Sequence, residues 1–320
     1  MKKNKIKDTG LEITELSFGT SSLGSMPDTY GYEVSEERAQ KTLNRFFQGP
    51  VNMLDTSRNY AMGESEKRIG RAIKENGGWP KDFLLSTKLD RNMETLVLDK
   101  NRARESLEES LKTLNVDSVD ILFLHDPEYA KDITDITKKD GAMDELFKIK
   151  DEGLAKAVGV AMGKVDIMFP LLKDWDFDVL INHNRYTLIN REANKMYEYA
   201  SSKNIAIFNA APYAGGVLAK GPDNFKKVTY QDATEEKLAP VREFQKVCKK
   251  HNVELGAAAL QFSLRDKRIT STICGVTSVE SIEKNLAWAN ALISDEFWDE
   301  ISKLPFSIND PESERVFTPG

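Results

Sequence analysis

Residues 51–73, VNMLDTSRNYAMGESEKRIGRAI, carry the pattern that decides the fold. The run 51–55 is short and apolar, as a strand buried on both faces should be, and it ends on the charged Asp55. A polar loop follows. Residues 65–76 then have the pattern of an amphipathic helix, which stops at a Gly-Gly pair. The stretch is therefore predicted to be one strand–loop–helix unit.

The same unit recurs along the whole chain. Short apolar runs lie at 16–20, 51–55, 83–88, 119–125, 155–160, 179–182, 205–210 and 271–275. Helical patterns alternate with them at 36–48, 65–76, 102–114, 142–151, 165–173, 192–203, 241–251 and 279–290. Alternating strands and helices form a parallel sheet, and eight such units predict a closed α/β barrel of the (β/α)8 TIM type. An open doubly wound sheet is the alternative.

Two segments fall outside the repeat. Residues 6–13, around Gly10, are predicted to form an N-terminal β-hairpin before the first barrel strand. Residues 212–240 are irregular and rich in glycine and proline, and a loop of that length is usually functional. No linker divides the chain, so residues 1–320 are predicted to be a single barrel domain with extended βα loops.

Composition excludes several classes of protein. Of the 320 residues, 40% are hydrophobic, which is enough for a full core and excludes a largely disordered chain. A net charge of −6 argues against a nucleic-acid partner, and no apolar run approaches the ~18 residues of a membrane span. The two cysteines, Cys248 and Cys274, suit a reducing compartment, so we expect a cytoplasmic protein with no membrane partner. Composition leaves the oligomeric state open.

The common short signatures of metal, nucleotide and hydrolase sites are missing. His125, His183 and His251 are the only histidines, so a histidine-built site is nearly excluded and we expect no metal. The sequence holds no HExxH, CxxC, GxGxxG, GxxxxGK[ST] or GxSxG motif. These absences argue against zinc proteases, dithiol redox proteins, Rossmann domains, P-loop proteins and serine hydrolases.

Four ionisable residues fall where the active sites of barrels lie, at the carboxyl ends of strands and in the loops that follow. Asp55, Lys88 and His125 end three successive predicted strands. Tyr60 lies in the loop after the first of them. Each residue alone is more simply explained as a turn residue, a rim lysine or a satisfied core histidine. Their coincidence at adjacent strand ends favours an active site.

These four side chains suit proton transfer to an oxygen atom. A tyrosine with a pKa near ~10 is a poor proton carrier at neutral pH, so we expect Lys88 to lower the pKa of Tyr60. The Asp55 carboxylate would keep that lysine charged, and His125 would hydrogen-bond a carbonyl or hydroxyl oxygen. Hydride would move at the attached carbon, which requires a nicotinamide because no side chain carries hydride.

With these residues identified, the chain resembles the aldo-keto reductase superfamily. Residues 54–73 match its pattern of Asp-Thr, Tyr and Gly-x-Ser-Glu, and STK at 86–88 and LFLHD at 122–126 match its next two signatures. The resemblance extends over residues 16–290 and implies a (β/α)8 barrel that binds NAD(P) without a Rossmann fold.

The resemblance also implies a catalytic tetrad of Asp55, Tyr60, Lys88 and His125. Tyr60 would be the general acid/base and Lys88 would modify its pKa. Asp55 would be the partner of Lys88, and His125 would orient the substrate.

The cofactor site that the resemblance implies departs from the family at three positions. Its expected members are Gly19, Thr20, Asp55, His183, Ala211, Pro212, Tyr213, Gly215, Gly275, Thr277, Ser281 and Asn285. Ala161-Met162 stand where the family has Ser-Asn, His183 replaces a Gln, and Ala210 replaces the aromatic residue that stacks on the nicotinamide. The carboxamide is then expected to be held by His183, by backbone groups or elsewhere.

The family binds the adenosine 2′-phosphate at the end of the eighth strand and the start of the next helix. The usual basic positions there are Gly275 or Thr277 and Ser281 in this chain, and none of them offers a charge-assisted bond. Lys284 lies nearby and would compensate only in part. We expect NAD to be preferred, with NADP possible.

Three loop segments narrow the resemblance. NRYTLINRE at 184–192, FNAAPYAGGVLAKGPD at 208–223 and CGVTSVESIEKNL at 274–286 resemble the branch that contains L-galactose dehydrogenase and D-threo-aldose (L-fucose) dehydrogenase. This implies oxidation of an aldose at its anomeric carbon to the lactone, with Tyr60 as the base. Two alternatives stay open: an NADPH-dependent reductase of aldehydes or ketones, and a cofactor-binding regulatory barrel.

Overall fold

Eight parallel strands close into a barrel in the structure, a computed structural model that describes residues 1–315. The barrel strands are β3 (Leu16–Gly19), β4 (Met53–Asp55), β5 (Leu84–Leu89), β6 (Val119–His125), β7 (Ala155–Met162), β8 (Val179–His183), β9 (Ala206–Ala210) and β12 (Ile269–Gly275). They pair in chain order, and β12 pairs with both β9 and β3 to close the ring. The predicted TIM barrel is confirmed, and the open sheet is excluded.

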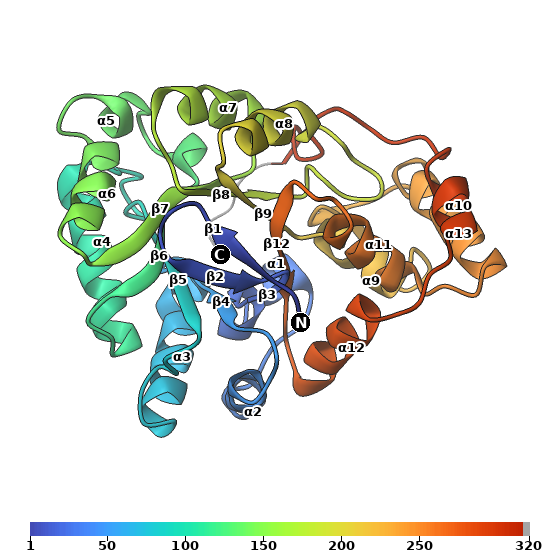
Figure 1. The fold of residues 1–320 in the computed structure, drawn as a ribbon, viewed down its shortest axis with the longest axis horizontal. Coiled ribbons are helices and arrows are strands. Elements are labelled where there is room, and N and C mark those ends of the chain that lie inside the picture. Colours follow the sequence, from blue (N-terminus) through green and yellow to red (C-terminus); the bar gives the residue numbers. More distant parts are fainter. Residues whose placement is uncertain (316–320) are drawn as a thin grey trace.

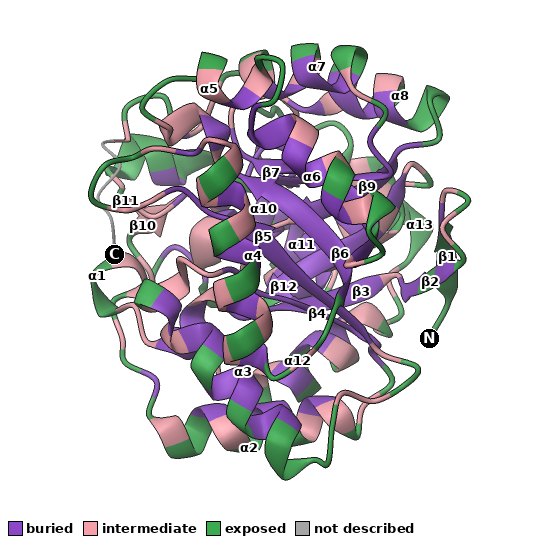
Figure 2. Cartoon of the chain, turned by 90° about the vertical axis from the view of Figure 1, so that its left-hand side faces the viewer, coloured by how far each residue is buried: buried purple, intermediate pink, exposed green. Residues whose placement is uncertain are grey.

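Helices surround the barrel strands (Figure 1). The helices that follow the barrel strands are α2 (Glu36–Phe47), α3 (Glu64–Glu75), α4 (Lys100–Leu114), α6 (Ala142–Asp151), α7 (Val165–Asp174), α8 (Asn194–Ser202), α11 (Leu255–Leu264) and α12 (Val279–Ala289). Figure 2 shows that the strands are buried, while the helices expose one side to solvent. This accounts for the two patterns in the sequence, continuous apolar runs in the strands and amphipathic periods in the helices.

The predicted N-terminal hairpin is also confirmed. It consists of β1 (Lys3–Ile6) and β2 (Leu11–Thr14), which pair antiparallel, and Gly10 takes the left-handed conformation in the turn with a φ of 76°. Ile6 and Ile13 are fully buried and pack with the residues that fill the barrel interior, such as Phe123. One end of the interior is thereby sealed by apolar side chains.

The segment between β9 and β12 is more ordered than the sequence predicts. It holds α9 (Val217–Lys220), the short hairpin β10 (Lys227–Val228) and β11 (Gln231–Asp232), and then α10 (Glu235–Lys250) before α11. The helix predicted at 241–251 begins earlier because Thr234 accepts a hydrogen bond from the backbone N–H of Lys237 and caps it, with Pro240 inside the helix.

Several shorter elements were not predicted. They are α1 (Pro27–Tyr30), α5 (Thr134–Thr137), α13 (Asp295–Ile301) and the 3₁₀ turns η1 (Ser21–Gly24), η2 (Tyr60–Gly63), η3 (Pro127–Tyr129) and η4 (Ala214–Gly216). None of the described helices combines the length and the apolar character that crossing a membrane requires.

Candidate active site

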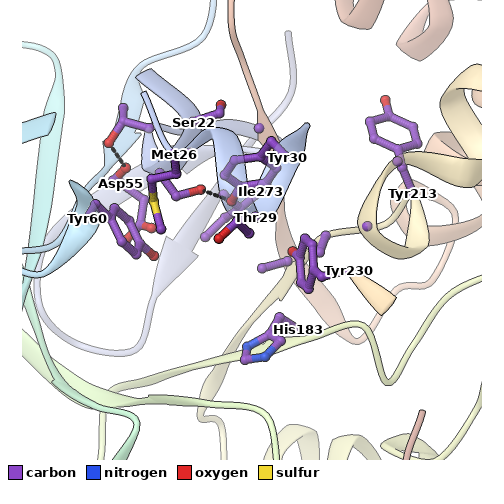
Figure 3. A pocket seen from close by; sticks show the side chains of 18 of the residues that line it. Ser22, Met26, Thr29, Tyr30, Asp55, Tyr60, His183, Tyr213, Tyr230 and Ile273 are labelled. Carbon is purple, nitrogen blue, oxygen red and sulfur yellow. Dashed lines mark hydrogen bonds between the residues drawn. The ribbon is translucent and has the colours of Figure 1, made fainter. Parts of the chain in front are cut away.

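The structure brings the four predicted catalytic residues to one cavity. All strands of the barrel are parallel, so the residues that end β4, β5 and β6 lie on the same rim. A cavity of about 440 Å³ opens there and is lined by Asp55, Tyr60, Lys88 and His125, and it reaches across the barrel to Asn285 on α12. Figure 3 shows Asp55 and Tyr60 side by side in this cavity. Its size is ordinary for a small-molecule site.

Lys88 is the centre of the hydrogen-bond network. Its side chain is 2% exposed, and Nζ lies 3.0 and 2.9 Å from the two carboxylate oxygens of Asp55. Nζ also donates to the carbonyl of Thr56 at 2.5 Å and to the hydroxyl oxygen of Tyr60 at 3.1 Å. An ammonium group has three hydrogens, and three residues accept them. Because the tyrosine oxygen accepts from Lys88, its own proton is left for the cavity.

A strained turn presents Tyr60 to the cavity. Ala61 and Met62 have φ values of 50° and 53°, and Gly63 follows at 90°. Left-handed conformations are costly for residues with a side chain, and they concentrate where function requires an unusual path. The turn lifts the phenol back over the strand end, within reach of Lys88.

The charge balance around Tyr60 is opposite to the sequence-based expectation. Burial of the ring and then the negative charge of Asp55 raise the pKa of Tyr60 well above its usual range. The net direction differs from the expected one because both oxygens of Asp55 lie on the Lys88 ammonium and offset its charge. Tyr60 is protonated at neutral pH and is set to donate a proton.

His125 completes the group from β6. Its ring meets the ring of Tyr60 edge to face, with centroids 5.7 Å apart. Nδ1 lies 2.5 Å from Oδ1 of Asp90 and 3.1 Å from the hydroxyl of Ser57. Nε2 lies 3.7 Å from a carboxylate oxygen of Asp126. Burial alone disfavours the charged ring, but the carboxylates of Asp126 and Asp90 outweigh it and raise the pKa of His125.

The residues expected to hold a cofactor lie mostly along the same cavity. Its lining includes Gly19, Thr20, Asp55, His183, Ala211, Tyr213, Gly215, Gly275, Thr277, Ser281 and Asn285. Pro212 is buried and does not line it. A side chain at Gly275 would meet no protein atom within 4 Å, so the wall is open there. The cavity thus continues from the tetrad to the junction of β12 and α12, where its wall is open.

The wall expected to hold a nicotinamide is made of small apolar residues. Ala161, Met162 and Ala210 line the cavity as anticipated, and His183 lies beside them. Nε2 of His183 is 3.8 Å from the buried carboxylate of Glu312, in the C-terminal segment. His183 therefore has a charged partner on the side of Nε2.

An aromatic residue that the sequence did not indicate enters this region. Tyr230 lies in the turn between β10 and β11, and Figure 3 shows it between Tyr30 and His183. Its ring meets that of Tyr30 edge to face at 6.0 Å, and Arg315 lies 5.0 Å above it. Thr229 and Tyr230 both have positive φ, 46° and 68°, so this turn too is strained.

The hydroxyl expected to face a 2′-phosphate is fully used by the protein. Ser281 Oγ accepts from the backbone N–H groups of Thr277 and Ser278 and donates to the carbonyl of Ser278 at 2.6 Å. It closes the capping box that starts α12. Two cations lie near: Lys284 lines the cavity, and Arg38 Nη2 lies 3.4 Å from the hydroxyl of Thr277.

The sequence held a signal for some of the missed residues. Ser57 and Asp90 stand two positions after Asp55 and Lys88, and residues two apart in a strand point to the same side. The strand-end argument therefore extends to them. Tyr230 and Arg315 gave no such signal, because they reach the cavity from segments far along the chain.

Comparisons with known proteins agree with this geometry. A model of the aldo/keto reductase family matches residues 15–305. The chain is 30% identical to L-galactose dehydrogenase of Arabidopsis thaliana over 291 residues, which is 90% of this chain and 88% of that protein. It is 27% identical to D-threo-aldose 1-dehydrogenase of a Pseudomonas species, over 92% of this chain and 94% of that protein.

A solved structure shows the same fold. An aldo-keto reductase from Bacillus halodurans in its holo form superposes with a TM-score of 0.79 at 21% identity, covering 99% of this chain and 100% of that one. The resemblance inferred from the motifs is confirmed.

Proposed function

The chain belongs to the aldo/keto reductase family, and from this premise we propose that it oxidises an aldose at the anomeric carbon to the lactone. The family membership makes it an NAD(P)-dependent oxidoreductase. The finer proposal is supported by the names of the relatives, two of which are sugar dehydrogenases. It is carried by one observation: several hydrogen-bonding side chains line the cavity on the side of Tyr60.

That end of the cavity is lined with hydrogen-bonding side chains. They are Asn59, Arg91, His125, Asp126, Tyr129 and Arg315, which lie at or after the ends of β4, β5 and β6 and in the C-terminal segment. A polyol presents several hydroxyls that need partners when they leave water. Met26 and Met93 are among the apolar side chains that line the same cavity. The hydrogen-bonding side chains can pair with the hydroxyls of a sugar, which an alkyl aldehyde lacks.

The roles of the tetrad follow from the hydrogen bonds. In oxidation Tyr60 takes the proton of the anomeric hydroxyl, and Lys88 donates to the phenolate oxygen that results. Asp55 holds Lys88 in place, and His125 binds the same substrate oxygen. A bound nicotinamide supplies the acceptor for the hydride that leaves the carbon. The residues proposed to hold it are those of the cavity wall named above, with His183 at the carboxamide.

Reduction of a carbonyl is the second candidate, and the protonation of Tyr60 favours it. The raised pKa makes Tyr60 a ready proton donor and a base only at alkaline pH. A base must lose its proton before it acts, so we expect the rate of aldose oxidation to rise with pH across the neutral range. The acid form of Tyr60 persists over the same range, so Tyr60 itself sets no pH limit on reduction there.

We also propose NAD as the preferred cofactor. Ser281 is saturated by the cap of α12, so its hydroxyl has no hydrogen bond left for a phosphate. Gly275 has no side chain, and Thr277 offers only a neutral hydroxyl. A charge-assisted contact contributes about 1.5–3 kcal/mol, so its loss weakens a phosphate site.

The test is an initial-rate screen of aldoses with NAD⁺ and NADP⁺, run beside simple aldehydes with NADH and NADPH. We expect several aldoses to be oxidised, with the lactone as product. If aldehyde reduction is about a hundredfold more efficient than any aldose oxidation at the pH optimum of each, the reductase replaces the sugar dehydrogenase.

A further inference from the structure

A buried carboxylate outside the tetrad lies against the catalytic group. Asp90 directly follows β5, is 0% exposed, and is two residues beyond Lys88. Its Oδ1 lies 2.5 Å from Nδ1 of His125. Its Oδ2 accepts from the hydroxyl of Ser57 at 2.5 Å and from the backbone N–H of Asn59 at 3.1 Å. The proposed roles of the tetrad give Asp90 no part in the chemistry.

These contacts decide which nitrogen of His125 carries a proton. Burial alone would raise the pKa of Asp90, but the charge of His125 and its hydrogen bond outweigh burial and lower the pKa, so Asp90 is an ionised acceptor. The hydroxyl proton of Ser57 points at Asp90, so the Ser57 oxygen turned to Nδ1 is an acceptor as well. Two acceptors face Nδ1, which must therefore be the N–H.

We propose that Asp90 is a positioning residue that fixes Nδ1–H of His125 and so leaves Nε2 to bind the substrate oxygen. The inference rests on the proposed role of His125 as the group that orients the substrate. With a neutral ring Nε2 is an acceptor and binds a hydroxyl. With a protonated ring it is a donor and binds a carbonyl. The Asp90–His125 pair thus selects between the alcohol and the carbonyl form of the substrate according to pH.

The charged groups that face the His125 ring determine the pH at which this selection occurs. Asp90 approaches from β5, Asp126 from the end of β6 and Tyr60 from η2, and the ammonium of Lys88 lies close enough to oppose the two carboxylates. Together these groups favour the protonated ring and raise the pKa of His125. Removing the charge of Asp90 leaves Asp126 as the one carboxylate within 4 Å of the ring among residues 1–315.

The test reads His125 directly in the protein without substrate. The chain has three histidines, so ¹⁵N-histidine NMR gives three resolvable titrations, and His125→Gln assigns one of them. We expect Nδ1 to be protonated in the wild type at alkaline pH. Asp90→Asn should lower the pKa of His125 by about 1–3 units, the size of effect that a close opposite charge has. His251, at the end of the outer helix α10, should not change.

Two further variants separate positioning from a general effect of the substitution. Asp120→Asn removes another buried carboxylate, one that accepts from the backbone N–H of Leu85, and should leave His125 unaltered. Ser57→Ala keeps Asp90 but removes one acceptor from Nδ1, and should shift His125 in the same direction by a smaller amount. If Asp90→Asn does not fold, the tautomer of His125 in the wild type is the test.

An unchanged titration and tautomer of His125 in Asp90→Asn, or a proton on Nε2 instead of Nδ1 in the wild type at alkaline pH, overturns the inference. The kinetic readout is the KM of an oxidised aldose, which should fall as pH rises through the pKa of His125 and should do so at lower pH in Asp90→Asn. A shifted NMR titration in a protein that oxidises no aldose would leave the pairing intact and contradict the proposed function instead.

Discussion

At the scale of single residues, one ammonium group links Asp55 and Tyr60 of the tetrad. Lys88 divides its hydrogens among Asp55, the carbonyl of Thr56 and Tyr60. The Asp55 carboxylate balances the positive charge of Lys88. Lys88 can therefore donate to the phenol of Tyr60 without being an isolated buried charge. A buried ion pair is tolerated when both partners are fully hydrogen-bonded, as here.

Tyr60→Phe should stop proton transfer and keep the shape of the site. General acid/base groups contribute about 10²–10⁴-fold, so turnover should drop by at least that order. Binding of NADH, followed by fluorescence titration, should persist. Tyr199→Phe, on the outer helix α8, is a matched control that should behave as wild type. Retention of more than about a tenth of turnover, with chemistry rate-limiting, would show that Tyr60 is not the proton carrier.

Lys88→Met should abolish turnover at every pH and also destabilise the fold. It leaves Asp55 buried without its cation, and breaking a buried pair costs about 3–5 kcal/mol. The double variant Asp55→Asn, Lys88→Met removes both charges and should recover most of the stability in denaturant unfolding, but none of the turnover.

Lys156→Met is the matched control for that experiment. It breaks another Lys–Asp pair, to Asp120, in which the lysine side chain is 59% exposed. It should leave turnover unchanged. Normal kinetics in Lys88→Met would mean that Lys88 is an ordinary rim lysine.

Three tetrad residues could be predicted from the sequence because they lie at the ends of strands. Asp55, Lys88 and His125 follow apolar runs, so the geometry of a parallel barrel places them together without further information. The direction of the Tyr60 pKa could not be predicted because the sequence does not show that Asp55 binds Lys88 through both oxygens, or how far the Tyr60 ring is removed from water.

At the scale of elements, helices that face solvent were predicted and a buried one was not. α11 reads LGAAALQFSL, and seven of its residues, from Gly256 to Ser263, are buried. A helix that is apolar all round has no amphipathic period to detect. The barrel strands are short and mostly apolar, and their ends were predicted to within about two residues of the structure.

The junction of β12 and α12 should prefer NADH over NADPH. The saturated Ser281 and the absent side chain at Gly275 remove two contacts that a phosphate dianion would need, and each is worth roughly 10–150-fold in affinity. Dissociation constants for both cofactors, by fluorescence titration of the free enzyme, are the measurement.

Binding of NADPH that is tenfold or more tighter would overturn the preference and increase the weight of the reductase candidate. Lys284→Ala and Arg38→Ala would then identify the cation responsible, because these two lie nearest to Thr277 and the cavity wall.

At the scale of the whole molecule, the C-terminal segment joins two long loops above the barrel. Glu312 is 4% exposed and accepts from Asn184, Arg185 and Arg315. The carbonyl of Pro311 accepts from the hydroxyl of Thr229, in the β10–β11 turn. We infer that residues 1–315 fold as a single unit, so that far-UV circular dichroism and tryptophan fluorescence should report one coincident unfolding transition.

Nothing in the sequence indicated this connection. The residues that form it are more than 80 positions apart along the chain, and Arg185 and Glu312 look like surface charges when each is considered alone. Their side chains are each 1% exposed, and only the fold shows that they meet.

Glu312→Gln should destabilise the protein by about 3 kcal/mol at neutral pH, because it leaves Arg185 buried with less opposing charge. Burial alone would raise the pKa of Glu312, but its bonds to His183, Arg185 and Arg315 outweigh burial and lower it. A lowered pKa in the folded state means that this stability is present above the ordinary pKa of a glutamate, about 4.3, and is lost below it. The difference in the free energy of unfolding between wild type and variant, measured by denaturant unfolding, should therefore narrow as pH falls below about 4.

Glu314→Gln is the control, two residues away in an exposed pair with Lys237, and its free energy of unfolding should equal that of the wild type at every pH. If the difference for Glu312→Gln stayed constant down to pH 3, the amide would destabilise the protein through its shape and not through the missing charge. The segment would then be held by packing instead of by the ion pair.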